Sequence, residues 1–492
     1  MAEAVHLLLL LLTFVFFSPV QSASKVLFHG LGVDYGQLGD NLPSPEASVA
    51  LMHSLRSSAV KIYDANPEIL RALSGSNLVV SVMVPNGLLP SIGTNQSAAD
   101  AWVSSNIVPF YGSVRLRFLL VGNEILSNYA SNSTFWPFLV PAMTRLHRSI
   151  RLFSLHGIKV STPHAMDVLQ SSFPPSSGRF RSDIAVLIIR PMLEFLRRTS
   201  SYFMIDAYPY FPWSENPNSI SIDYALFQGN SSLYYHDPVT GLTYTNLLDQ
   251  MLDAMAAAIA AEGFAEVRLG LAETGWPNAG DLDEIGANVH NAAIYNRKLA
   301  IRVAEQRGLR TPARPAAAIP VFVFSLYNED LKTGPGTERH WGLLYPNGTA
   351  VYEVDLKGRR PEASYPPLPP ATNNEPFKGK LWCVLETNGG LNLTAVAAAL
   401  SYACGQGNGT CAAIQTGGKC FQPNTVAAHA KYAFNSYWQQ FRSTGGSCYF
   451  NGLAVQITTD PSKFFFLLIF KKKKKAFLTS QKKKKNFLFL FL

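Results

Sequence analysis

The stretch VRLGLAETGWP, residues 267–277, decides the fold, because an almost continuous apolar run ends there in a carboxylate and a turn. A strand buried on both faces reads as such a run, and Pro277 argues against its continuing further. A helical pattern precedes it at Thr245–Glu262, where apolar residues recur four apart and Gly263 is placed to end the helix. The order of helix, buried strand and polar turn predicts an α/β fold.

The same unit recurs along the first domain. Apolar runs of strand length alternate with helical patterns such as Asn288–Arg307, and eight such units are what a (β/α)8 TIM barrel requires. An open doubly wound sheet is the competitor, but no phosphate-cradling glycine loop accompanies the strands. We therefore predict a barrel over residues 24–356. Its expected strands are Phe28–Tyr35, Val60–Tyr63, Leu78–Val84, Arg117–Val121, Ile158–Ser161, Phe203–Ala207, Val267–Ala272 and Ile319–Ser325.

The charge of the chain gives no sign of a polyanionic partner. The formal net charge is +9 at pH 7, but the nine lysines at 471–475 and 482–485 account for it. Without them, 33 basic side chains balance 33 acidic ones, so we expect no basic surface for a nucleic acid.

The first residues predict a secretion signal at 1–23. The apolar run Leu7–Phe17 is too short to span a bilayer, and small residues at Ser22–Ser24 are typical of a cleavage site. An uncleaved anchor is the alternative, because only His6 could supply charge to the n-region. We expect a secreted protein of the extracellular space or cell wall. Six N-x-S/T sequons agree with secretion, and they begin at Asn95, Asn132, Asn230, Asn347, Asn392 and Asn408.

The cysteines divide the chain into domains. All five lie between 383 and 448, so a large domain that relies on its core precedes a small one that relies on disulfides. The proline-rich linker at 357–380 is expected to be semi-extended and to keep the two domains apart. We predict a small, disulfide-rich and mainly helical module at 381–462, followed by an aberrant low-complexity tail at 463–492.

Two glutamates follow strands that face each other across an eight-membered ring. Glu124 follows Leu119–Val121 after two residues, Gly122 and Asn123, and Glu273 comes directly after Leu269–Ala272. The carboxyl ends of barrel strands open on one face, so both side chains are expected in one bowl. Glycoside hydrolysis needs one protonated and one ionised carboxyl, and we predict roughly 5–5.5 Å between them, the retaining geometry. The alternative, that both are ordinary rim charges, suits either glutamate alone better than the pair.

Other side chains at the strand ends are expected to support this pair. Asn123 can hydrogen-bond a sugar 2-hydroxyl, Tyr208 can orient the nucleophile, and Trp276 can offer an apolar face to a sugar ring. Core packing is the alternative for Tyr208 and Trp276.

A third polar cluster follows the last strand. Lys332, between Glu329 and Glu338, is expected to lower the pKa values of both carboxyls, unless the three form a solvated loop. No metal-ligand spacing appears, so we expect neither a metal nor a cofactor.

Several motifs of the first domain resemble those of plant endo-1,3-β-glucosidases of glycoside hydrolase family 17. They are GVDYG at 32–36, NLPSP at 41–45, YDAN at 63–66, VGNE at 121–124, AYPYF at 207–211, ETGWP at 273–277 and KTG at 332–334. The resemblance covers residues 28–355 and implies an endo-acting, retaining hydrolase of 1,3-β-glucan such as callose. It implies Glu124 as general acid/base and Glu273 as nucleophile. It also implies supporting roles for Tyr63, Asn123, Tyr208, Glu329, Lys332 and Glu338.

Two residues depart from the family pattern. Asp34 and Asp206 stand where asparagine is expected. Asp206 is close to the predicted bowl, so its charge is expected to raise the pKa values of neighbouring carboxyls and thereby to shift the pH optimum.

The cysteine-rich segment resembles the glucan-binding modules of carbohydrate-binding module family 43. The resemblance rests on residues such as Trp382–Val384, Cys420–Ala427 and Ala433–Trp438. It implies 1,3-β-glucan binding, for which Tyr437 and Trp438 are candidates, with core packing as the alternative. It further implies the disulfides Cys383–Cys448 and Cys404–Cys411. Such modules usually carry six cysteines, so Cys420 is left without its partner.

The tail at 463–492 has three interpretations. A lipid-anchor signal would need an apolar run of ~10–20 residues, whereas lysines interrupt the runs here. A basic membrane-binding tail is the second. The third, which we favour, is an artefact of the gene model, because A/T-rich DNA encodes repeats of Lys, Phe, Asn and Leu.

Two alternative functions stay open on the sequence alone. A non-catalytic wall-binding scaffold would not need both glutamates, Asn123 and Tyr208. A transglycosylase would use the same covalent intermediate with a sugar acceptor. We expect a monomer whose partner is 1,3-β-glucan, with membrane association only if the tail is a genuine anchor.

Overall fold

The computed structural model describes residues 28, 30–127, 133–387, 390–407 and 409–461. The expected signal peptide, the tail at 463–492, Asn132 and Asn408 lie outside these residues. Among the residues described, no helix is both long enough and apolar enough to cross a bilayer.

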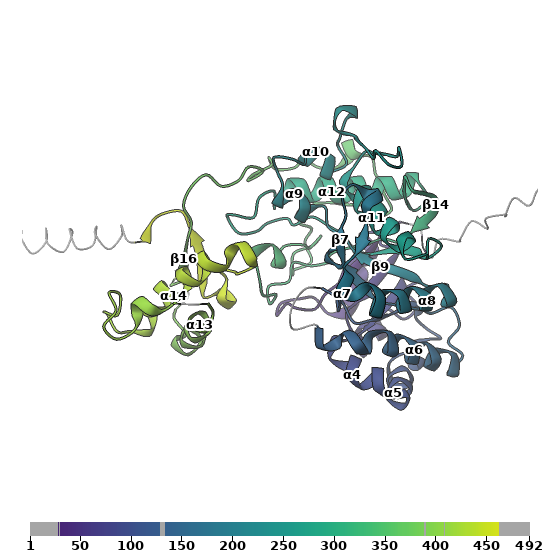
Figure 1. Ribbon diagram of the computed structural model, residues 1–492, viewed down its shortest axis with the longest axis horizontal. Helices are drawn as coiled ribbons and strands as arrows, with labels where there is room; N and C mark the ends of the chain where they lie inside the picture. Colours follow the sequence, from purple (N-terminus) through teal and green to yellow (C-terminus); the bar gives the residue numbers. More distant parts are fainter. Residues whose placement is uncertain (1–27, 29, 128–132, 388–389, 408, 462–492) are drawn as a thin grey trace, which may run out of the picture.

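Within the described residues, eight parallel strands close into a barrel (Figure 1). Hydrogen bonds join them in the orders β15-β1-β2-β3-β4-β5 and β12-β9-β6, and β5 and β6 are two halves of one strand. A parallel bridge between Leu271 and Val321 closes the ring between β12 and the strand that contains β15. The predicted (β/α)8 barrel is thereby confirmed. Its strands are β1 (Gly32–Tyr35), β2 (Ala59–Ile62), β3 (Val79–Val84), β4 (Arg115–Val121), β5 (Lys159–Ser161), β6 (Pro163–Ala165), β9 (Tyr202–Asp206), β12 (Arg268–Glu273) and β15 (Phe322–Val323).

Two long helices, α11 (Leu247–Ala261) and α12 (Val289–Glu305), begin at capping residues that their sequences provide. Asn246 accepts the N–H of Asp249 ahead of α11, and Asn288 caps α12 in the same way. Gly263 follows α11 with φ of 88°, a conformation that favours glycine. The other helices of this domain are α2 (Pro45–Ser54), α3 (Pro67–Ala72), α4 (Leu89–Thr94), α5 (Gln96–Asn106), α6 (Trp136–Leu152), α7 (Ser182–Ile184), α8 (Arg190–Thr199), α9 (Tyr210–Glu215) and α10 (Ile222–Ala225).

Within the described part of the chain, three short hairpins lie in the loops of the barrel. They are β7 (Leu169–Ser171) with β8 (Arg179–Phe180), β10 (Tyr235–His236) with β11 (Thr243–Tyr244), and β13 (Leu309–Thr311) with β14 (Arg314–Ile319). The hairpins lie outside the parallel ring and therefore do not alter the order of the barrel strands.

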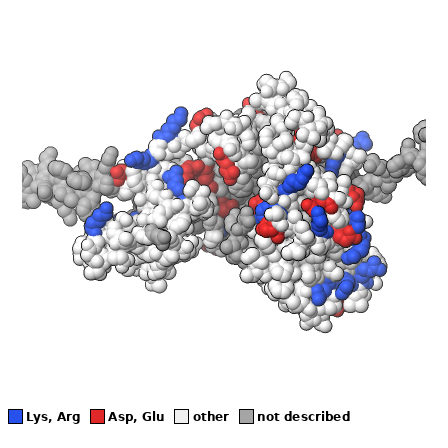
Figure 2. Space-filling model, viewed as in Figure 1, with Lys and Arg blue, Asp and Glu red and all other residues white. Residues whose placement is uncertain are grey.

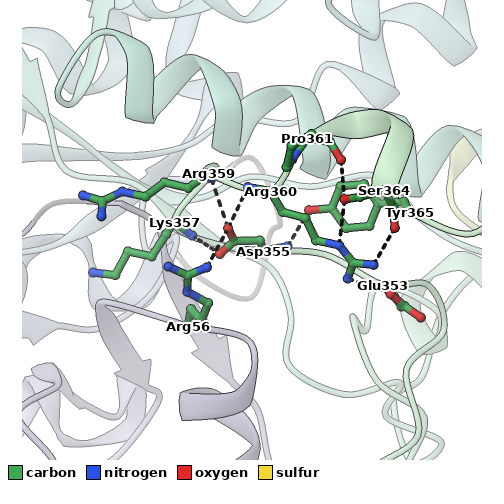
Figure 3. Close-up of polar contacts among 9 residues, drawn as sticks. All are labelled: Arg56, Glu353, Asp355, Lys357, Arg359, Arg360, Pro361, Ser364 and Tyr365. Carbon is green, nitrogen blue, oxygen red and sulfur yellow. Dashed lines mark hydrogen bonds and ion pairs between the residues drawn. The ribbon is translucent and has the colours of Figure 1, made fainter.

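A buried carboxylate fastens the end of the barrel domain to its beginning. Asp355 is 4% exposed and accepts Nη1 of Arg56 at 3.3 Å (Figure 3). The next residue, Leu356, accepts the N–H of Leu31 at 3.0 Å, just ahead of β1. Three backbone N–H groups also point at the Asp355 carboxylate within 3.1 Å, and they belong to Lys357, Arg359 and Arg360.

The described part of the C-terminal module is built on two α-helices and one antiparallel pair of strands, which come from the two ends of the module. These are α13 (Leu393–Gly405), α14 (Val426–Phe441), β16 (Trp382–Leu385) and β17 (Ala454–Ile457). The module contains the disulfides Cys383–Cys448 and Cys404–Cys411, and Cys420 is a free thiol. Tyr437 and Trp438 are 8% and 1% exposed, so they belong to the module core and cannot act as exposed sugar platforms.

The linker does not hold the two domains apart, contrary to the sequence-based expectation. Its residues follow the barrel surface: Asn288 Nδ2 donates to Thr372 O at 2.8 Å, and Gly286 N–H donates to Asn373 O at 2.8 Å. The module consequently lies beside the barrel in Figure 1 and hydrogen-bonds to it, for example from Gln456 to Asp283 at 2.9 Å. A proline-rich chain remains extended, but backbone acceptors along it still bind polar groups on a neighbouring surface.

Candidate active site

Three donors converge on the carboxylate of Glu273, which ends β12 and is 5% exposed. Tyr63 OH donates to Oε1 at 2.6 Å and Tyr208 OH donates to Oε2 at 2.6 Å. Lys61 Nζ donates to Oε1 at 2.7 Å. Charge-assisted hydrogen bonds of this length hold a carboxylate in one orientation and favour its ionised form.

Lys61 is a functional residue that sequence analysis missed. It lies inside β2, is 0% exposed, and forms a second ion pair with Asp34 Oδ1 at 3.6 Å. Burial alone would lower the pKa of Lys61, but the negative charges of Asp34 and Glu273 outweigh it and raise that pKa. The signal in the sequence was a single lysine in the otherwise apolar strand AVKI, because a buried lysine needs a carboxylate partner.

The pKa of Glu273 is lowered by its partners. Burial acts in the opposite direction, but the charge of Lys61 and hydrogen bonds from Lys61, Tyr208 and Tyr63 outweigh it. The carboxyl group of Glu273 is therefore deprotonated and negatively charged at neutral pH, as a nucleophile must be.

Glu124 is presented by a strained turn after β4. Gly122 and Glu124 have positive φ values of 69° and 49°, and the N–H of Glu124 donates to Pro163 O at 3.2 Å. Asn86, which the sequence analysis did not single out, clamps the turn from both sides. Its Oδ1 accepts the N–H of Asn123 at 2.8 Å, and its Nδ2 donates to Asn123 O at 3.1 Å. A non-glycine residue in this region costs energy, and such strain clusters at functional sites.

The surroundings of Glu124 raise its pKa, whereas those of Glu273 lower the pKa of Glu273. Burial raises the pKa of Glu124 to about 8, with further contributions from the negative charges of Glu273 and Asp167. At neutral pH this carboxyl group holds its proton. One protonated and one ionised carboxyl in one site are what general acid catalysis with a carboxylate nucleophile requires.

Both glutamates line one cleft of about 780 Å³ on the barrel. The structure brings together in this cleft all but one of the residues that the sequence analysis selected. They are Tyr63, Asn123, Glu124, Tyr208, Glu273, Glu329, Lys332 and Glu338.

Trp276 is the exception, and its predicted role as a sugar platform is wrong. Its side chain is 0% exposed and donates its indole N–H to Gly286 O at 2.8 Å. It packs against Trp213 and Tyr295 in the core, with ring centroids 5.3 and 5.9 Å away. The aromatic wall of the cleft is formed instead by Phe211, Phe324 and Trp341, of which Phe211 is 40% exposed.

The polar cluster of Glu329, Lys332 and Glu338 agrees only in part with what the sequence led us to expect. Lys332 Nζ lies 3.7 Å from Glu329 Oε2, and Glu329 Oε1 accepts the N–H of Leu38 at 2.8 Å. Lys332 also lies 4.2 Å from the ring centre of Phe324. Burial nevertheless raises the pKa of Glu338, and Lys332 offsets this only in part. The expectation that the lysine would lower the pKa of Glu338 below its ordinary value is therefore wrong.

Asp206 and Asp34 place two more carboxyls beside the nucleophile. Asp206 pairs with Glu273 across β9 and β12, lines the cleft, and has no hydrogen-bond partner for either oxygen among the described residues. Burial raises the pKa of Asp206 well above its ordinary value, and the charge of Glu273 adds to the shift. Burial and the neighbouring charge of Glu273 therefore favour the protonated form of Asp206. Among the described residues, no cluster of acids, histidines and cysteines could hold a metal ion.

Residues 31–356 match Glycosyl hydrolases family 17. The chain belongs to this family. Residues 381–455 match the X8 domain, so the family 17 barrel carries an X8 module at its C-terminal side. The two matches agree with the position of the barrel and of the disulfide-bonded module in Figure 1.

Two curated relatives of this family 17 chain match most of its length. It is 50% identical over 431 residues to "Probable glucan endo-1,3-beta-glucosidase A6" of Arabidopsis thaliana, with 88% of this chain and 89% of the relative covered. It is 36% identical to "Glucan endo-1,3-beta-D-glucosidase" of Olea europaea, with 92% and 96% covered. Among solved structures, the beta-1,3-glucanase and pollen allergen CJP38 of Cryptomeria japonica is 38% identical, with a TM-score of 0.62 over 66% of this chain and 99% of that one.

Proposed function

We propose that this protein is an endo-acting, retaining hydrolase of 1,3-β-glucan, with Glu273 as nucleophile and Glu124 as general acid/base. The observation that carries the proposal is the pair of opposed carboxyls in one cleft. The pKa of Glu124 is raised to about 8 by burial, whereas Lys61 and two tyrosines keep that of Glu273 low.

The proposed reaction proceeds by two displacements. The carboxylate of Glu273 attacks the anomeric carbon, and the bond to the glycosidic oxygen breaks as Glu124 gives that oxygen its proton. A covalent glycosyl–Glu273 ester forms, and the shortened glucan leaves. Glu124, now ionised, takes a proton from water as the water oxygen attacks the anomeric carbon. Glu273 is released as a carboxylate, so both groups return to their starting states.

The substrate follows from the family and from the shape of the site. Relatives with 36–50% identity that match 88–92% of this chain are named for endo hydrolysis of 1,3-β-glucan. The half-exposed ring of Phe211 on the cleft wall suits the apolar face of a pyranose ring, and Asn123 and Glu338 supply polar groups. The buried orientation of Tyr63 and Tyr208 toward Glu273 also favours a catalyst over a mere scaffold.

A secreted location in the extracellular space or cell wall completes the proposal. The module depends on two disulfides, which persist in oxidising compartments. Four sequon asparagines lie on the described surface and are exposed, as glycosylation requires: Asn95, Asn230, Asn347 and Asn392.

The test is hydrolysis of a linear 1,3-β-glucan by the full chain, measured as release of reducing ends. We expect Glu273→Gln to lose at least ~10³-fold in kcat and to bind the glucan as the wild type does, because the isosteric amide cannot attack. Rapid turnover by this variant would refute the nucleophile assignment. Products longer than the starting oligosaccharide, at high oligosaccharide concentration, would favour the transglycosylase instead.

A further inference from the structure

The X8 module contacts a barrel segment beside the cleft. Gln456 of β17 accepts the N–H of Leu282 at 3.0 Å through its Oε1, and its Nε2 donates to Asp283 Oδ1 at 2.9 Å. Arg442, which follows α14, places Nε 3.8 Å from Asp283 Oδ2. Figure 2 shows acidic side chains gathered on this face where the module meets the barrel. Gln456 thus hydrogen-bonds to two adjacent residues of one barrel loop, Leu282 and Asp283. Two such bonds fix the orientation of the module as well as its position.

A second contact reaches the loop that carries the third polar cluster of the cleft. Tyr449 of the module donates its OH to Asp330 O at 3.2 Å. The guanidinium carbon of Arg339 lies 3.5 Å from the ring centre of Tyr449, a close cation–π contact. Asp330 directly follows Glu329 and Arg339 directly follows Glu338, both of which line the cleft.

The segment 281–284 connects these two contacts. Its outer residues, Leu282 and Asp283, touch the module, whereas Asp281 and Glu284 face the barrel. Glu284 Oε2 accepts the N–H of Thr337 at 2.9 Å, and Oε1 accepts Thr337 Oγ1 at 2.5 Å. Asp281 Oδ2 accepts the N–H of Gly336 at 3.1 Å. The packing there is close, because a Cβ added to Gly336 would lie 2.5 Å from Asp281 N.

The linker also contacts this segment, through Asn373. Asn373 Nδ2 donates to Glu284 O at 3.0 Å, and Asn373 O accepts the N–H of Gly286 at 2.8 Å. The tether between module and barrel is therefore shortened to the few residues after Asn373. A short tether keeps the local concentration of the module high, so even modest contacts hold it in place.

We propose that the X8 module braces the wall of the cleft: its docking on residues 281–284 and 330–339 holds Glu329, Lys332 and Glu338 in place for the reaction. This inference rests on the proposed function. The described lining of the cleft consists of barrel residues alone, so a short glucan bound there touches no side chain of the module. A module that acted only as a glucan anchor would not affect such a substrate, whereas a brace does.

The experiment compares full-length variants on a linear 1,3-β-linked pentasaccharide. Gln456→Ala removes both hydrogen bonds of this contact from the module side. Asp283→Ala removes its hydrogen bond with Gln456 and its ion pair with Arg442 from the barrel side, where folding of the module is not at risk. We expect each to lower kcat/KM by about fivefold or more. We also expect a larger maximum dimension in small-angle X-ray scattering. Gln440→Ala is the matched control, because Gln440 is exposed on α14 and, among the described residues, its side chain hydrogen-bonds only to Ser436 of the same helix.

The possible outcomes distinguish failure of the brace from failure of the proposed function. Wild-type kinetics in Asp283→Ala would overturn the brace, whether or not the scattering changes, and so would an effect of equal size in Gln440→Ala. An effect of Gln456→Ala without one of Asp283→Ala would also overturn it, because it would report on module folding. Absence of pentasaccharide and polymer hydrolysis by the wild type would instead count against the proposed function.

Discussion

Lys61 lies beneath the proposed nucleophile and joins it to a second buried acid. Its Nζ contacts Glu273 at 2.7 Å and Asp34 at 3.6 Å, and none of its surface is exposed. Removing one member of a buried ion pair leaves the other charge uncompensated, which typically costs about 3–5 kcal/mol. We infer that Lys61 positions the carboxylate of Glu273 and keeps it ionised.

Replacing this lysine is the sharpest test at the residue scale. We expect Lys61→Met to lower kcat about 10–100-fold, the equivalent of one lost charge-assisted hydrogen bond. The pKa of Glu273 should rise, so the acid limb of the pH profile should move to higher pH. Lys298→Met serves as control, because Lys298 forms only a surface ion pair with Glu362. An unchanged acid limb would contradict a positioning role.

The pH dependence of kcat/KM follows from the two glutamates. In the proposed mechanism, the active form has Glu124 protonated and Glu273 ionised. Activity should therefore be lost on the alkaline side as pH rises through about 8, the raised pKa of Glu124. On the acid side it should be lost only below the ordinary range of a glutamate, because the pKa of Glu273 is lowered. A profile measured on the pentasaccharide that falls before pH 6 on the alkaline side would contradict this assignment.

At the scale of elements, the segment that follows the last barrel strand holds the end of the barrel domain against its beginning. Asp355 accepts one side-chain and three backbone donors, and the adjoining Leu356 contacts the residue ahead of β1 (Figure 3). In a barrel the first and last strands must meet, and contacts such as these hold the chain ends at that meeting point.

We expect Asp355→Ala to lower the free energy of unfolding by about 3 kcal/mol, since three backbone N–H groups and Arg56 lose their acceptor. The melting temperature should fall by several degrees in calorimetry, while the pH profile of activity keeps its shape. Glu362→Ala is the control and should change stability by less than ~0.5 kcal/mol, because its ion pair with Lys298 lies at the surface. Equal melting temperatures for the two variants would contradict the structural role of Asp355.

At the scale of the whole molecule, barrel, linker and module form one continuous set of contacts. Linker residues 369–374 bind the loop around Gly286 and the first turn of α12, and the module binds the loop just before them. The module has its own buried core, which contains Phe434 and Trp438 and is closed by Cys383–Cys448. Its contacts with the barrel are mostly polar, as is usual between domains of one chain.

The unpaired thiol of Cys420 predicts a folding hazard for this module. We expect Cys420→Ser to keep both disulfides and wild-type activity, because the thiol belongs to neither. Under oxidative refolding it should yield fewer disulfide-linked oligomers on a non-reducing gel, since an odd thiol invites wrong pairing. The same amount of linked species in both proteins would show that Cys420 is not the cause.

The sequence by itself determined the barrel, its strand order and the positions of the two glutamates. Strands buried on both faces read as apolar runs, and side chains at their carboxyl ends share one face, so local patterns suffice for both. The burial of Trp276, the clamp of Asn86 on Asn123 and the raised pKa of Glu338 were decided by the tertiary structure. So was the partner of Lys61, which lies 212 residues away at Glu273. Burial and pairing of polar groups depend on which distant segments come into contact. The periodicity within one segment does not reveal those contacts.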